Sequence, residues 1–128
     1  MTTHSMRRLI LFSVVVLLSA VAQASAQDQN KADRGQSKQQ VEFGIKVAQN
    51  NLWNEALYRW QKATELDPSY AAAYNDLAVA YEHEGQLDKA RQAYEKAVEL
   101  APDNSQIRQN YELFKEINDR TSQAKDKP

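Results

Sequence analysis

Few side chains in this 128-residue chain could do metal or acid–base chemistry, since it has two histidines and no cysteine. Without a thiolate, a disulfide framework, an iron–sulfur cluster and a cysteine nucleophile are all excluded. His83 is flanked by Glu82 and Glu84. Side chains that are adjacent on a helix point in different directions, so these three residues do not form a metal site. We expect His83 to be solvated near a helix end, where its charge suits the helix dipole.

The carboxylates and glycines also lack a catalytic pattern. Glu95 and Glu99 have helical spacing on a face expected to meet solvent, whereas a catalytic pair needs a shielded cleft. The three glycines are too scattered for a phosphate-binding loop. We therefore expect no enzyme activity and no catalytic, cofactor or metal site. The alternative, an enzyme or metal carrier that depends on His83, requires loss of activity or metal in His83→Ala.

The charge balance argues against a nucleic-acid partner. Lys plus Arg number 16 and Asp plus Glu number 17, so the net charge is −1. A generic nucleic-acid-binding protein needs an excess of basic residues to neutralise phosphates. We expect no nucleic-acid partner.

The first segment has the pattern of a secretory signal peptide. Arg7-Arg8 precede the apolar run 9–18, and a small-x-small sequence ends at Ala26. We expect residues 1–26 to be removed, with Ala24 as the other candidate cleavage position, and export by the general secretory route. An uncleaved anchor stays an alternative, but the apolar stretch 9–22 is shorter than the ~20 residues of a spanning helix. The mature protein would be periplasmic or secreted, without a stable membrane span.

After the polar segment 27–36, which we expect to be a flexible linker, the chain repeats itself. Residues 37–70 match residues 71–104 at an offset of 34. Identical pairs are Ala56 with Ala90, Lys62 with Lys96, Ala63 with Ala97, Glu65 with Glu99, Leu66 with Leu100 and Pro68 with Pro102. The matching landmarks predict two copies of one structural unit.

Each copy has the periodicity of two helices. Tyr74, Leu77 and Tyr81 lie at i, i+3 and i+7, which is one helical face. Leu87, Ala90 and Tyr94 form a second face with the same spacing. We expect helices at about 38–50, 54–66, 71–84, 88–100 and 105–119.

Turn residues separate these expected helices. Gly85 lies between two periodic runs, where a helix commonly ends in the left-handed conformation, and Asn51 occupies the matching position of the first copy. Pro68 and Pro102 cannot continue a helix, so each copy must end there. Small residues such as Gly44 let the paired helices approach closely.

A 34-residue period with aromatic, small and proline landmarks resembles the tetratricopeptide repeat. The second copy matches the family pattern at Tyr74, Leu77, Ala78, Tyr81, Gly85, Ala90, Tyr94, Ala97 and Pro102. The first copy departs from it at Gln40 and Lys46. The resemblance implies an all-α fold of antiparallel helix pairs, stacked as a short right-handed α-solenoid. It also implies repeats at 37–70 and 71–104, a capping helix at 105–119 and a disordered tail at 120–128.

The resemblance also implies a place for a partner, because in this family the first helices of the repeats line a concave groove that accepts a peptide or helix. By register the groove residues are Lys38, Val41, Glu42, Ile45, Gln49, Asn75, Asp76, Val79, Glu82, His83, Gln109 and Leu113. Acids outnumber the one lysine in this set, so we expect a mildly acidic groove with an apolar strip that prefers a neutral-to-basic apolar segment. The alternative, given equal weight, is that the acids only keep an exposed helix face soluble.

These features together predict a protein-interaction module, an adaptor or assembly factor acting outside the cytoplasm. Two repeats fall below the ~3 that usually make a stable stack. The alternative function is therefore a structural subunit, which self-associates as a homo-oligomer or docks permanently on a larger envelope complex through its end faces.

Overall fold

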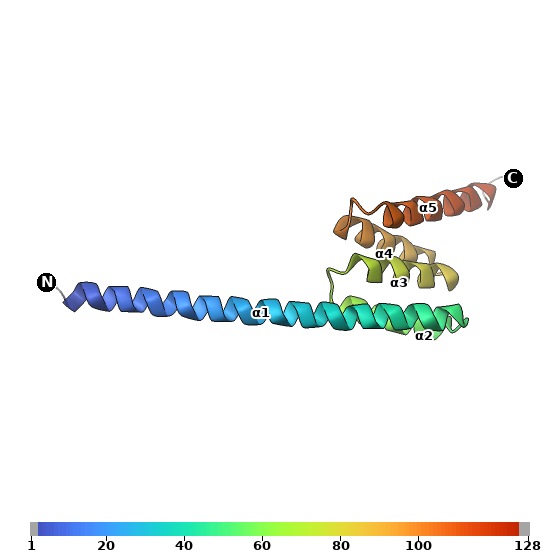
Figure 1. The fold of residues 1–128 in the computed structure, drawn as a ribbon. Helices are drawn as coiled ribbons and strands as arrows, with labels where there is room; N and C mark the ends of the chain where they lie inside the picture. Colours follow the sequence, from blue (N-terminus) through green and yellow to red (C-terminus); the bar gives the residue numbers. More distant parts are fainter. Residues whose placement is uncertain (1–2, 126–128) are drawn as a thin grey trace. The chain divides into compact units, whose positions relative to one another are not determined.

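The fold is known from a computed structural model that describes residues 3–125, and the side chains of residues 19–120. The described residues form five helices and no strand, which confirms the all-α fold. The helices are α1 (Thr3–Gln49), α2 (Trp53–Leu66), α3 (Ala71–His83), α4 (Leu87–Leu100) and α5 (Ser105–Lys125) (Figure 1). None of the helices in this part of the chain has the length and apolarity required to cross a membrane.

The chain divides into two units, residues 1–33 and 34–128, and α1 contributes to both. The expectation of a flexible linker at residues 27–36 is wrong, because this segment is helical in the structure. Its residues include good helix formers such as Gln, Lys and Ala, and Gln29 Nε2 donates a hydrogen bond to Asp33 Oδ1 at 2.8 Å. This segment lacks an apolar stripe because its helix has no buried face, and not because it is unfolded.

The second unit stacks its helices in chain order. The last part of α1 pairs with α2, α3 packs on α2 and α4, and α5 packs on α4 and α3 (Figure 1). Asn51 has φ 60° and Gly85 has φ 72°, which confirms the left-handed turn positions. The amides that follow these residues close both turns, Leu52 N on Val47 O at 3.0 Å and Gln86 N on Tyr81 O at 2.8 Å.

The contact between α1 and α2 is close because small residues lie at it. A Cβ placed on Gly44 would lie 2.8 Å from Trp60 Cδ1, so only glycine fits beside this indole. The Trp60 Nε1–H donates to the Val41 carbonyl at 3.2 Å. The Ser37 hydroxyl is fully buried and donates to the Ala63 carbonyl at 2.8 Å. These contacts fix the end of α1 against α2.

The turn between α2 and α3 is held by a residue from the segment expected to be a linker. Asp67 Oδ1 accepts hydrogen bonds from the Ser69 backbone N at 3.0 Å and the Ser69 hydroxyl at 2.6 Å. Its Oδ2 pairs with Arg34 Nε, and Arg34 also donates to the Ser69 hydroxyl at 3.0 Å. Burial raises the pKa of Asp67, but the hydrogen bonds from Arg34 and Ser69 and the Arg34 charge outweigh it, so the pKa lies below its ordinary value.

The last helix is longer than expected. α5 begins at Ser105 and continues to Lys125, so residues 120–125 of the expected disordered tail are helical, and residues 126–128 lie outside the described part. Asn104 Oδ1 accepts a hydrogen bond from the Ile107 backbone N at 3.1 Å and caps this helix. Phe114 is 1% exposed, and its ring centroid lies 5.2 Å from that of Tyr94. α5 therefore closes the core beside α4.

Candidate partner-binding groove

A hollow of about 340 Å³ lies between α1 and α3, with two side chains of α2 reaching into it. Its lining residues are Ile45, Ala48, Gln49, Trp53, Trp60, Asp76 and Val79. We call it the α1–α3 hollow. From the predicted groove, Ile45, Gln49, Asp76 and Val79 come together here. Apolar walls with few polar groups are typical of a binding site.

The groove prediction missed Trp53 and Trp60, because it drew on the first helix of each pair and on the last helix, and not on the second helices. Trp60 is 3% exposed and belongs to the core, but it also forms part of the wall of the hollow. Trp53 begins α2 directly after the turn from α1, and its ring stacks on His83 with centroids 4.0 Å apart and planes 14° apart. The position of Trp53 at the start of α2 was the available signal, since a large side chain there can reach the end of α3.

Asp76 is the one ionisable side chain that lines the α1–α3 hollow. Its carboxylate is half-buried and accepts one hydrogen bond from Asn75 Nδ2, at 3.1 Å. Among the described residues it has no ion pair. Burial raises the pKa of Asp76 to about 6, and the Asn75 hydrogen bond lowers it only in part. The hollow therefore holds an acid whose charged form is poorly compensated.

Two predicted groove residues are buried. Val41 is 5% exposed and packs in the core, so it does not line a groove. Asn75 is 9% exposed, and its Oδ1 accepts a hydrogen bond from Asn110 Nδ2 at 2.9 Å, which ties α3 to α5. Both side chains are buried because each packs against a neighbouring helix, Val41 in the core and Asn75 against α5.

The other predicted residues are distributed around the hollow. Glu82 accepts a hydrogen bond from the Tyr94 hydroxyl at 3.0 Å. Lys38 and Glu42 are exposed on α1, and Glu42 borders a separate shallow hollow of about 270 Å³. Gln109 and Leu113 border another hollow, of about 460 Å³, on the exposed face of α5. The twelve predicted residues thus do not form one continuous pocket in the structure.

The ionisable residues do not form a metal centre in the part of the chain that the structure describes, where no group of three His, Asp or Glu side chains could hold an ion. His83 is half exposed, and its Nδ1 lies 3.6 Å from the Glu84 carboxylate. The imidazole ring of His83 stacks on the Trp53 ring. The α1–α3 hollow offers recognition by shape and charge, through its apolar walls and the Asp76 carboxylate.

The helix pairs, their turns and their landmark residues match a known family. The family described as "Tetratricopeptide repeat" matches residues 71–104, and the one described as "TPR repeat" matches residues 47–85. These matches support the tetratricopeptide repeat family for residues 47–104. Repeats of this family bind protein partners, so the repeat region of this chain is a protein-interaction module.

Two curated relatives and one solved structure are similar to the chain. It is 27% identical over 113 residues to the type IV pilus assembly protein PilF of Pseudomonas aeruginosa, covering 86% of this chain and 45% of that protein. It is 25% identical over 84 residues to human protein O-mannosyl-transferase TMTC1, covering 66% of this chain and 10% of that protein. The chain thus spans less than half the length of these relatives. The Arabidopsis OM64 TPR domain shares the fold, with a TM-score of 0.63 and 22% identity over 72% of this chain and 76% of that one.

Proposed function

We propose that this protein is a noncatalytic adaptor or assembly factor that binds a neutral-to-basic apolar segment of a partner in the α1–α3 hollow. The observation that carries the proposal is Asp76, a half-buried carboxylate without an ion pair among the described residues, set among apolar walls. A ligand that brings both a cation and an aliphatic side chain satisfies the two properties of this site.

The energetics favour such a ligand. A desolvated carboxylate without a cation is unfavourable in its charged form, and a Lys or Arg side chain of the partner supplies the missing charge. The walls formed by Ile45, Trp53 and Val79 accept an aliphatic side chain, which displaces water from apolar surface. An acidic segment would instead add like charge next to Asp76.

We place this activity outside the cytoplasm. The expected cleavage after Ala26 falls inside the first unit, 1–33, and leaves the second unit whole from Arg34. The similarity to a pilus assembly protein supports a role in assembly. The matched part of the O-mannosyl-transferase is only 10% of that enzyme, so the similarity gives no support for transferase activity.

A second candidate function is that of a structural subunit that self-associates. It is favoured by two exposed apolar side chains on α5, Leu113 at 56% and Ile117 at 49% exposure. Light scattering on the purified protein separates the two functions, because a monomer supports the adaptor and a dimer that Leu113→Gln dissociates supports the subunit.

The adaptor proposal is tested with a displayed library of random peptides selected on the protein. We expect enrichment of Lys or Arg beside Leu, Ile or Val. Ile45→Glu should remove the aliphatic preference, because it replaces an apolar wall with a charge, and Asp76→Asn should remove the preference for cations while the aliphatic preference stays. Gln39→Glu and Glu42→Gln are the matched controls, since they change charge on the exposed face of α1 outside the hollow.

An enrichment of Leu, Ile or Val that Ile45→Glu leaves unchanged contradicts binding in the hollow. The export part is tested separately by expressing the full chain in a bacterium and measuring the mass of the exported product. A mature protein that begins at Gln27 is expected, and an intact N-terminus in that fraction contradicts it.

A further inference from the structure

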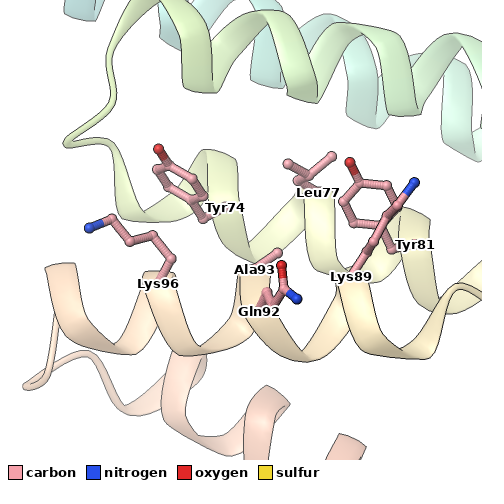
Figure 2. A pocket seen from close by; sticks show the side chains of 7 residues that line it. All are labelled: Tyr74, Leu77, Tyr81, Lys89, Gln92, Ala93 and Lys96. Carbon is pink, nitrogen blue, oxygen red and sulfur yellow. The ribbon is translucent and has the colours of Figure 1, made fainter.

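A second pocket, of about 330 Å³, lies between α3 and α4. We call it the α3–α4 pocket, and its lining residues are Tyr74, Leu77, Tyr81, Lys89, Gln92, Ala93 and Lys96 (Figure 2). At about 100° per residue, its α3 residues face roughly the opposite side of that helix from Asp76 and Val79. It is therefore distinct from the α1–α3 hollow.

The α3–α4 pocket is cationic. It has two lysines and no acid among its lining residues. Lys89 Nζ lies 5.5 Å from the centroid of the Tyr81 ring and pairs with no carboxylate among the described residues. Lys96 forms an ion pair with the exposed Glu99 at 3.2 Å, a contact that a better-placed carboxylate can replace at little cost.

Neutral donors accompany the lysines. The Tyr74 hydroxyl and the Gln92 amide make no hydrogen bond with the side chains that the structure describes, so both are available to a ligand. The floor between them is apolar and consists of Leu77 and Ala93. Donors around an apolar floor suit a ligand that carries carboxylates and an aliphatic group.

The charges stand at the two ends of the pocket. Figure 2 shows Tyr74 and Lys96 at one end and Tyr81 and Lys89 at the other, with Leu77 between them. Lys89 and Lys96 are seven positions apart on α4, which corresponds to about 10 Å along the helix. In a peptide of polyproline II conformation, which has three residues per turn and a rise of about 3.1 Å, acids at positions i and i+3 lie on one face and ~9 Å apart.

From this match we propose that the α3–α4 pocket binds an acidic segment of a second protein, in which two carboxylates flank one aliphatic side chain. The carboxylates pair with Lys89 and Lys96, and the aliphatic group rests on Leu77. The α1–α3 hollow, with its single acid, would reject the same segment. The module then holds two partners of opposite charge on opposite sides of α3, as an adaptor requires.

The test uses the full chain and a short acetylated and amidated peptide with the core Glu-Gly-Leu-Glu, followed by NMR shifts of the Lys and Tyr side chains. We expect saturable shifts at Tyr74, Lys89 and Lys96. The double variant with Lys89→Glu and Lys96→Glu should weaken binding about fivefold or more. A peptide with the core Lys-Gly-Leu-Lys should bind that double variant and restore the shifts at Tyr74.

Lys62→Glu is the matched control, because Lys62 occupies the position of Lys96 in the first repeat and pairs with Glu65 at 3.1 Å in the same way. It should leave binding unchanged, and so should Ile45→Glu, which alters only the α1–α3 hollow. The proposal is overturned if no shifts arise at the pocket, if Lys62→Glu weakens binding as much, or if inorganic phosphate gives the same shifts as the peptide. Each of these results leaves the peptide selection at the other hollow untouched.

Discussion

At the residue scale, the two glycines of α1 have opposite roles. Gly44 lies against the Trp60 indole, where a Cβ would be 2.8 Å from Cδ1, while a Cβ on Gly35 would meet nothing within 4 Å. We predict that Gly44→Ala lowers the free energy of unfolding by about 1–3 kcal/mol, because the added methyl overpacks the contact. Gly35→Ala should raise it by about 0.5–1 kcal/mol through helix propensity. Urea denaturation measures both, and equal effects of the two would contradict the close contact.

Asp76 also gives a stability prediction. Its pKa in the folded protein is about 6, against 3.8 for the free side chain, so the folded state binds the proton more tightly. Stability is therefore highest below pH ~4, falls as the pH rises to ~6 and is constant above that. We predict that Asp76→Asn removes this fall and stabilises the protein at pH 7 by about 2 kcal/mol or less.

Thermal melts between pH 4 and pH 7 measure this effect. Glu42→Gln, an exposed acid on α1, serves as the control and should leave the pH profile unchanged. If Asp76→Asn melts lower than the parent at pH 7, the carboxylate stabilises the free protein and its role as an uncompensated ligand-binding charge is refuted.

At the scale of elements, the start of the repeat region depends on the ion pair between α1 and the α2–α3 turn. The pKa of Asp67 lies below its ordinary value, so this group contributes stability that is present above the unfolded pKa of ~3.9 and is lost as the pH falls through the folded pKa. We predict that Arg34→Gln lowers the melting temperature at neutral pH and reduces the loss of stability on acidification below pH 4.

The comparison is a set of melts from pH 7 to pH 2. Arg108→Gln is the control, since Arg108 is exposed and has no ion pair among the described residues. If Arg34→Gln and Arg108→Gln behave alike, Arg34 does not hold the turn, and residues 34–36 would have no part in the folded unit.

At the scale of the whole second unit, α5 completes the core that two repeats leave open. Phe114 is 1% exposed and contacts Tyr94, while the adjacent Leu113 is 56% exposed. We predict that Phe114→Ala costs about 3–5 kcal/mol, because it leaves a cavity beside Tyr94. Leu113→Ala should change stability by less than ~0.5 kcal/mol.

Chemical denaturation decides this point. Since the stability of a small domain is only about 5–15 kcal/mol, Phe114→Ala brings the unit close to unfolding, and Phe114→Leu should retain most of the stability. Should all three variants unfold at the same urea concentration, α5 would be an appendage and not the closing helix of the stack.

The sequence by itself determined the helix pairs and their turns. The period of 34, the apolar faces of the repeats and the positions of Asn51 and Gly85 are local properties, and the backbone confirms the turn residues through their positive φ. The sequence pattern did not predict the helix at residues 27–36, because a helix that buries no face has no periodic spacing of apolar residues. The resemblance to the tetratricopeptide repeat depends on the same local landmarks.

Only the tertiary structure decided which side chains form the site. The register of a helix gives the side that a residue faces, but not how the neighbouring helix rotates against it or how far a large side chain reaches. Val41 and Asn75 share the predicted side with Ile45 and Asp76, yet they are buried. Trp53 from α2 completes the hollow in their place. Burial and the contacts between helices depend on packing across distant parts of the chain. The same packing buries Asp76 and so raises its pKa.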